Sequence, residues 1–219
     1  MNFFAHAALA LWRSDDPRFV LGSMLPDFAG MLGLRVLRID DRALAAGVTY
    51  HHATDAAFHR APLFVELCTR GIETLSAAGV ARGTARAVAH VGTELLLDGA
   101  LSHLQPARVA YQGSLRAALS ERYVDAFTLE AEEHVERFQT GLARLATAPV
   151  PDGYRDPEFV LARLRSTLTR RPRLAMRDTD VEHVRSHLHE FEPLVRQGWP
   201  ELLDQVRTEL CRAETAASA

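Results

Sequence analysis

Two stretches of this sequence carry imidazole and carboxylate side chains at intervals of four residues. The two series are His51, Asp55 and His59, and His90, Glu94 and Asp98. Residues four apart lie on one face of a helix, so each series forms a stripe of metal-ligand type. Most neighbours are small or aliphatic, which predicts that the stripes face other helices. Since a buried carboxylate needs a cation or hydrogen-bonding partners, each stripe indicates a metal site or an interior hydrogen-bond network.

Three more residues of ligand type lie in or beside apolar segments. His6 is the only ionisable group of residues 3–12, Asp27 is alone in residues 19–30, and His52 adjoins His51. Taken singly, His6 reads as a core histidine and Asp27 as a carboxylate at a helix start beside Pro26. Together with the two stripes, these residues predict one site formed by facing helices.

The predicted ligand set combines imidazoles and carboxylates without thiolate, which suits Mn²⁺, Zn²⁺, Fe²⁺ or Mg²⁺. Cys68 and Cys211 have no metal-binding spacing and are expected to be reduced core residues. A bound divalent cation activates water and neutralises charge on a phosphoryl oxygen. Hydrolysis of a phosphoester is therefore the expected reaction.

The elements that position these residues are expected to be helices, because no alternating strand pattern bounded by hairpin turns occurs. The fold prediction is an all-α, single-domain bundle over 1–219, with residues 1–146 holding the metal site and 158–215 forming C-terminal helices. Pro106 should close the helix of the second stripe. Helices are expected over 3–12, 45–59, 63–75, 85–103, 179–192 and 200–212, with one or two over 114–145 and a loop over 146–157.

Composition narrows the function classes. Hydrophobic residues make up 47% of the 219 residues and charged residues 24%, as in a soluble globular protein. A net charge of −3 argues against a general nucleic-acid binder. No segment reaches transmembrane length, so no stable membrane insertion and a cytoplasmic location are expected. Phosphate-loop, nucleophile-elbow and dinucleotide motifs do not occur.

Charged residues gather in two further places. Residues 159–177 contain six arginines and no acid, among them Arg170, Arg171 and Arg173. This segment is either a solvated helix end or a contact for an anionic partner or phosphate. His183 and His187 stand among charged residues and are expected at the surface. The acidic run is interpreted as a solvated face and comprises Glu130, Glu132, Glu133 and Glu136.

An ordered set of segments resembles the acyl carrier protein phosphodiesterases, a family distantly related to the HD phosphohydrolases. No segment is specific alone, but the set covers most of the chain in order. The matching segments are Met1-Asn2-Phe3-Phe4-Ala5-His6, Gly22 to Phe28, Gly47 with His51 and Asp55, Glu94 with Asp98, and Arg170-Arg171-Pro172-Arg173-Leu174.

The resemblance implies a metal-dependent enzyme, usually using Mn²⁺, with Zn²⁺ or Fe²⁺ as alternatives. Its reaction would remove 4′-phosphopantetheine from holo acyl carrier protein, and the arginines would suit that acidic partner. Catalytic roles are expected for Asp55, Asp98 and His59, and substrate binding for Arg170, Arg171 and Arg173. The expected metal ligands are His6, Asp27, His51, His52, Asp55, His90 and Glu94.

The chain departs from the family pattern at four positions. His52 replaces an arginine, Thr49 a histidine and Glu94 an aspartate. Gly99 stands where the family has a histidine after the second acid, so His59 and His90 are expected to supply the missing ligand. Leu25-Pro26-Asp27, His51 with His52, and His90 with Glu94 are also similar to helical zinc-dependent phospholipases C. A non-catalytic helical binding protein is the third alternative.

Overall fold

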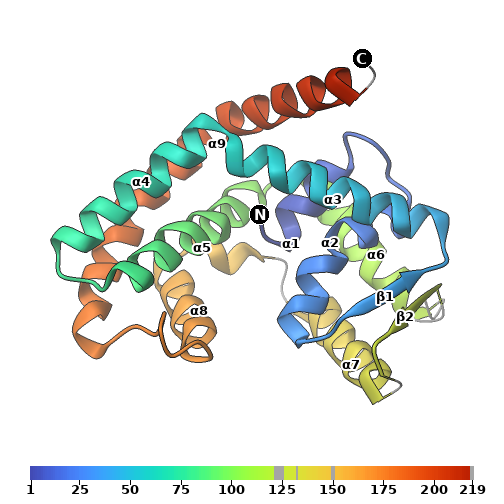
Figure 1. Cartoon of the computed structure of the whole chain (residues 1–219), viewed down its shortest axis with the longest axis horizontal. Helices are drawn as coiled ribbons and strands as arrows, with labels where there is room; N and C mark the ends of the chain where they lie inside the picture. Colours follow the sequence, from blue (N-terminus) through green and yellow to red (C-terminus); the bar gives the residue numbers. More distant parts are fainter. Residues whose placement is uncertain (121–125, 132, 149–150, 218–219) are drawn as a thin grey trace. The chain divides into compact units, whose positions relative to one another are not determined.

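The computed structural model describes residues 1–120, 126–131, 133–148 and 151–217 (Figure 1). Helices hold most of these residues, and the one sheet among them has two short strands, so the all-α prediction is confirmed. Contacts divide the chain into two compact units. Unit 1 comprises Met1–Asp55 and Leu101–Val150, and unit 2 comprises Ala56–Ala100 and Pro151–Ala219. The division at about residue 150 and the single domain remain predictions.

Unit 1 packs helices α1, α2 and α6 against one another, and α7 covers α2 and α6. Their start signals are local: Asp16 accepts the Arg18 N–H at 2.8 Å, and Pro17 occupies the first helical position of α2. Aromatic contacts centred on Phe28 and Phe138 fill the space between α2 and α7. The helices are α1 (Phe3–Ala10), α2 (Pro17–Leu32), α6 (Gln105–Ser120) and α7 (Glu133–Thr147). The part of α3 (Arg42–Arg60) from Arg42 to Asp55 also belongs to unit 1.

Unit 2 is built around α9 (Val181–Ala217), against which α4 (Pro62–Ala77) and α8 (Pro157–Thr169) pack. Helix α5 (Arg82–Leu101) belongs to this unit up to Ala100, and its Ala89 and His90 lie within that part. The last turn of α3 belongs to the unit as well. Two 3-10 turns, Pro151–Arg155 and Asp178–Asp180, precede α8 and α9. In the second turn, buried Asp180 accepts a hydrogen bond from Arg177 Nη2 at 2.6 Å.

Several helix boundaries differ from the sequence prediction. Pro106 lies in the first turn of α6 and does not close α5, because a proline fits where no intrahelical N–H bond is needed. Pro26 lies inside α2, so Asp27 is not a helix-start residue. The two C-terminal helices are one, since Pro193 and Pro200 are both within α9. Parts of three predicted segments lie outside the described residues. These parts are 121–125 and 132 of the predicted 114–145 helices, 132 of the acidic run, and 149–150 of the 146–157 loop.

A small sheet was not predicted. Strand β1 (Val36–Ile39) pairs antiparallel with β2 (Phe127–Leu129) in unit 1, with Ile39 opposite Phe127. Each strand is at most four residues long, too short for a visible alternation. In β2, buried Phe127 and Leu129 flank exposed Thr128, so the strand covers one side of the unit 1 core.

Candidate metal centres

Two glycines bring α2 and α3 together in unit 1. A Cβ atom on Gly22 would lie 2.2 Å from the Leu44 carbonyl oxygen, and one on Gly47 would lie 2.2 Å from that of Phe19. No side chain fits at either position without separating the two backbones. The crossing therefore depends on glycine, and it places His51, one turn beyond Gly47, beside the backbone of α2.

His51 is buried and its tautomer is set by this crossing. Its Nδ1 lies 2.8 Å from the Ser23 carbonyl oxygen, which can only accept, so Nδ1 carries the proton and Nε2 keeps its lone pair. Burial lowers the pKa of His51 to about 4, although the Ser23 hydrogen bond and Asp55 favour the charged form. The ring is therefore neutral at pH 7, which a metal-binding imidazole requires.

His6 lies against His51 in the same buried space. The two rings stack with centroids 4.0 Å apart, and the side chain of His6 is fully buried. Thr54 Oγ1 donates to backbone carbonyls of α3, so its oxygen is able to accept from His6 Nδ1, 3.5 Å away. With Nδ1 on the Thr54 side, Nε2 of His6 lies on the side of the carboxylates, 3.5 Å from Asp27 Oδ2.

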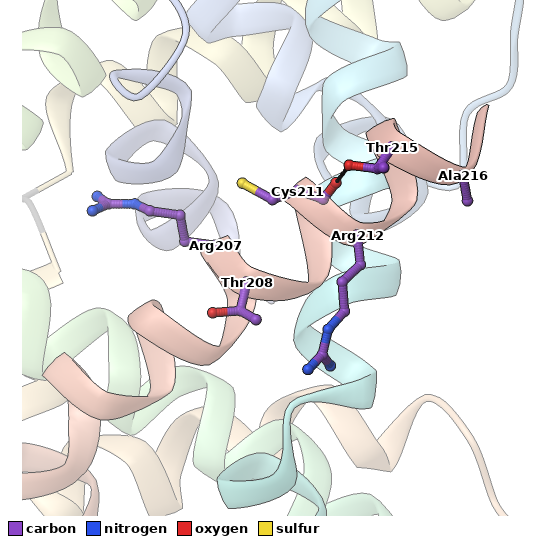
Figure 2. Close-up of a pocket in the computed structure, with 6 residues that line it drawn as sticks. All are labelled: Arg207, Thr208, Cys211, Arg212, Thr215 and Ala216. Carbon is purple, nitrogen blue, oxygen red and sulfur yellow. Dashed lines mark hydrogen bonds between the residues drawn. The ribbon is translucent and has the colours of Figure 1, made fainter. Parts of the chain in front are cut away.

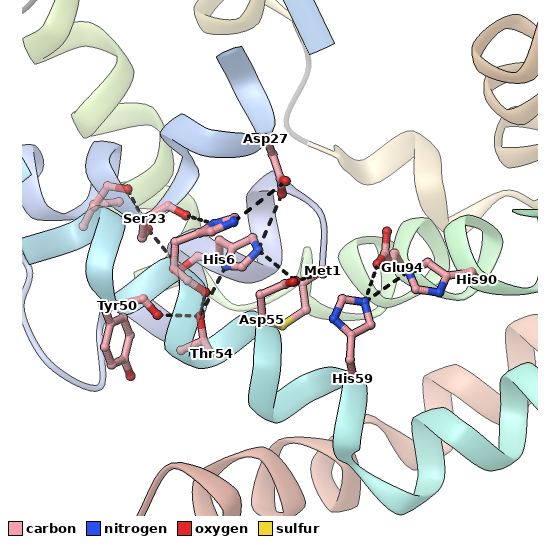
Figure 3. A network of polar contacts seen from close by, with 12 residues as sticks. Met1, His6, Ser23, Asp27, Tyr50, Thr54, Asp55, His59, His90 and Glu94 are labelled. Atoms are coloured by element: carbon pink, nitrogen blue, oxygen red, sulfur yellow. Dashed lines mark hydrogen bonds and ion pairs between the residues drawn. The ribbon is translucent and has the colours of Figure 1, made fainter. Parts of the chain in front are cut away.

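Two carboxylates complete the unit 1 group on its more exposed side (Figure 3). Asp27 Oδ1 lies 4.0 Å from His51 Nε2, and Asp55 Oδ1 lies 3.8 Å from His6 Nε2. The side chains of Asp27 and Asp55 are about one third exposed, whereas those of both histidines are almost fully buried. Asp55 also accepts a hydrogen bond from the amino group of Met1 at 2.7 Å. His6, Asp27 and His51 offer ligand atoms within 4.8 Å of one another.

Unit 2 holds a second group of three residues, His59, His90 and Glu94. His59 Nε2 and His90 Nε2 are 3.1 Å apart, and Glu94 Oε1 lies 3.5 Å and 3.0 Å from them. Burial alone would raise the pKa of Glu94, but this pKa lies well below the ordinary value, and the hydrogen bonds with both histidines are among the causes. Glu94 is therefore an anion at neutral pH.

Cys68 is no ligand in this group. Burial and the Glu94 charge raise the pKa of its thiol to about 12, so it stays protonated. It is only partly buried, and Cys211 is exposed, so the prediction of two core cysteines is wrong. Both cysteines are free.

Asp98 lies one turn beyond Glu94 and belongs to neither group. Its side chain is 1% exposed, and its charge together with burial raises the pKa of Tyr154, which nearby Arg163 lowers. The adjacent Gly99 is enclosed by the same loop, since a Cβ there would lie 2.3 Å from the Tyr154 carbonyl oxygen. No histidine fits at position 99 in this structure.

The remaining predicted site residues are exposed. His52 lies beside His51 with its ring at right angles and belongs to neither group. Arg170, Arg171 and Arg173 follow the end of α8, and no ion pair joins them to another described residue. Arg165 and Arg177, from the same basic segment, pair with Asp178 and Asp180.

The histidines of α9 correct one prediction. His183 is exposed as expected, but His187 is 3% exposed and packs on Phe191. A Cβ on Gly71 of α4 would lie 2.9 Å from His187 Cε1, so this glycine provides the space for the ring. Burial lowers the pKa of His187 to about 4. The surface position was predicted from the charged residues that surround His187 in the sequence, but its side of α9 is buried.

An open hollow lies along the last turns of α9 (Figure 2). All of its lining residues come from this helix, and none is a histidine or a carboxylate. They are Arg207, Thr208, Cys211, Arg212, Thr215 and Ala216. Cys211 is the one metal-ligand type in this lining, and a single cysteine does not form a metal site, so the hollow is not a candidate active site.

Some positioning residues were not predicted from the sequence. Ser23 acts through its backbone carbonyl, Thr54 through its hydroxyl, and Tyr154 through its backbone beside Gly99. These roles cannot be recognised from the residue type in the sequence. Thr54, three residues after His51, is the one whose spacing offered a hint.

None of the helices in the described ranges is both long and apolar enough to span a bilayer.

The family model described as acyl carrier protein phosphodiesterase matches residues 1–202. The chain belongs to this family. Its matched region covers both groups of candidate ligands, and the predicted resemblance is confirmed. Neither the curated proteins nor the solved structures contain a match to the chain. Membership places the protein among phosphodiester hydrolases.

Proposed function

We propose that this protein is a metal-dependent phosphodiesterase that removes 4′-phosphopantetheine from holo acyl carrier protein. The observation that carries the proposal is the unit 1 group, in which His6 Nε2 and His51 Nε2 face the carboxylates of Asp27 and Asp55. Family membership supplies the substrate. The acidic carrier would also suit the exposed Arg170, Arg171 and Arg173.

The donor chemistry of this group fits a divalent metal. Two imidazoles and two carboxylates without thiolate match the ligand preferences of Mn²⁺, Fe²⁺ and Zn²⁺. The Ser23 carbonyl orients His51 as an outer hydrogen-bond partner orients a metal-ligating histidine. We take Mn²⁺ as the physiological metal from the family resemblance. When bound, such a cation polarises a phosphoryl oxygen and makes water a stronger nucleophile near neutral pH.

The residues around the group have separate tasks in this proposal. His6 and His51 form the buried inner side of the site and exclude water from it. Asp27 and Asp55 line the side that solvent and substrate reach. Asp55 is placed to accept a proton from the attacking water. Water adds to phosphorus and the bond from phosphorus to the carrier's ester oxygen breaks; that oxygen takes up the proton that Asp55 accepted and leaves as the hydroxyl of apo carrier. Catalytic roles for Asp98 and His59 remain predictions.

The test incubates holo acyl carrier protein with the protein and Mn²⁺ and follows the intact mass of the carrier. We expect the mass to fall by that of 4′-phosphopantetheine less one water, because hydrolysis adds water across the broken ester bond. Asp27→Asn and His51→Gln should each lower the rate at least about 100-fold, because removing even an outer partner of a metal ligand costs about 10–100-fold. Asp15→Asn and His103→Gln replace exposed residues outside both groups and serve as matched controls.

Two results would contradict the proposal. An unchanged carrier mass together with hydrolysis of bis(p-nitrophenyl) phosphate would point to another phosphodiester, as the phospholipase C alternative predicts. No hydrolysis of either compound, and equal thermal stability with and without Mn²⁺, would support the non-catalytic binding protein.

A further inference from the structure

We infer that unit 2 binds a metal ion of its own, of the Zn²⁺ class, through His59, His90 and Glu94. The inference does not depend on the reaction proposed above. It begins from three atoms: the Nε2 atoms of both histidines and Oε1 of Glu94 form a triangle with sides of 3.1, 3.0 and 3.5 Å (Figure 3). The two imidazole rings stack with centroids 4.8 Å apart and planes 20° from parallel.

The three atoms are closer together than hydrogen bonding alone requires. Each Nε2 carries either one proton or one lone pair, and the Glu94 carboxylate only accepts. If His59 donates to His90, the His90 lone pair faces the carboxylate oxygen at 3.0 Å. If both histidines donate to Glu94, they share one carboxylate oxygen and their two N–H groups lie side by side with the nitrogens 3.1 Å apart. A cation inside the triangle is attracted by all three atoms at once.

The size of the triangle matches a tetrahedral site. Zinc ligands of nitrogen and oxygen lie about 2.0–2.2 Å from the metal, so two ligands of a tetrahedron are roughly 3.3–3.6 Å apart. The observed sides of 3.0–3.5 Å need changes of only a few tenths of an ångström. Two imidazoles and one glutamate, with a fourth position left for water or a small anion, form a typical open zinc site.

The scaffold around the triangle holds the two rings and leaves access to solvent. His90 and Glu94 are one turn apart on α5, and His59 is in the last turn of α3. Phe64, which is 3% exposed, meets both histidine rings edge to face at 5.3 Å and limits their rotation. The side chains of His59 and His90 are 33% and 44% exposed, so a hydrated ion can reach them.

The choice of Zn²⁺ follows from the donors. Mg²⁺ and Ca²⁺ prefer oxygen ligands, whereas two imidazole nitrogens favour borderline transition metals. The unit 1 group differs by having two carboxylates within reach of its imidazoles. We therefore expect Zn²⁺ to bind unit 2 more tightly than Mn²⁺ does.

The test counts zinc ions per chain. Full-length protein is stripped with a chelator, equilibrated with Zn²⁺ and dialysed, and its metal is measured by inductively coupled plasma mass spectrometry. Wild type should hold two ions per chain, and His90→Gln and Glu94→Gln should each hold one. His103→Gln, an exposed histidine outside the group, should keep two. Circular dichroism verifies that the variants are folded, and two unit 2 variants protect the test against one that is not.

Asp27→Asn separates this inference from the proposed function. If Asp27→Asn loses one ion and His90→Gln loses the other, both sites are supported. If only His90→Gln loses an ion, the unit 2 site stands while the unit 1 site fails. Equal zinc content in wild type, His90→Gln and Glu94→Gln would overturn the inference, whatever the carrier-protein assay shows.

Discussion

The two metal-ligand groups are positioned in different ways. In unit 1, a backbone carbonyl and a hydroxyl orient His51 and His6, and a crossing of two helices at glycine holds them in place. In unit 2, His59, His90 and Glu94 orient one another, with a phenylalanine beside the rings. The first arrangement sets the tautomer of His51 before any ligand arrives, whereas the three side chains of the second contact one another directly. Preorganisation of this kind suits a catalytic centre.

Gly47→Ala tests the close helix crossing that positions the unit 1 group, and it has the largest expected effect. The new methyl group would lie 2.2 Å from a backbone oxygen of α2, so the helices must separate. We expect a loss of about 3 kcal/mol or more in unfolding free energy, measured by urea denaturation, and loss of carrier-protein hydrolysis. Gly30→Ala in α2 is the control, because nothing lies within 4 Å of its added Cβ. Equal stability of the two variants would exclude the close crossing.

A pH experiment compares buried His187 of unit 2 with exposed His183 on the same helix. The folded pKa of His187, about 4, is below the ordinary 6.5, so the folded state binds fewer protons between these values. The stabilising effect of the neutral ring is therefore complete above pH 6.5 and is lost as pH falls to 4. His187→Gln should flatten the acid side of the stability curve by up to about 3 kcal/mol. His183→Gln should leave the slope unchanged.

Thr54→Val tests whether the hydroxyl orients His6. Valine has nearly the shape of threonine but offers no acceptor to His6 Nδ1, so Mn²⁺ affinity should fall about tenfold in isothermal titration calorimetry. Thr69→Val in α4 removes a hydroxyl that also donates to a carbonyl four residues earlier but touches no ligand group. An equal affinity in both variants would show that Thr54 has no positioning role.

The smallest expected effect is that of Gly71→Ala in unit 2. Its Cβ would lie 2.9 Å from Ala89 Cβ and His187 Cε1, which are side-chain atoms and can shift. We expect a loss of about 1–2 kcal/mol in unfolding free energy, less than for Gly47→Ala. A loss as large as that of Gly47→Ala would mean that both units are equally intolerant at their helix contacts.

The sequence was sufficient to predict the helical class and the segments that carry the ligands. Spacing of four placed His51 and Asp55 on one helix, and His90 and Glu94 on another, because helical geometry acts locally. The sequence did not predict the short β1–β2 pairing or the continuous α9, since tertiary packing overrides the weak local signals at Pro193 and Pro200.

The grouping of ligands was harder to predict than their presence. One shared site was expected and stays a prediction; within each unit the structure brings three candidate ligands together, and Asp98 and His52 belong to neither group. Which residues meet depends on contacts such as the Ser23 carbonyl on His51, which have no sequence pattern. His187 shows the same lesson, because charged neighbours gave no sign that its ring is buried.

The loop carrying Tyr154 ties the identity of residue 99 to the rest of unit 2. Because its carbonyl fills the space beside Gly99, introducing the family's histidine there by itself would create a collision rather than a ligand. Any larger residue at this position would need the loop to be remodelled first, so Gly99 and the backbone around Tyr154 form one steric unit that must be redesigned together.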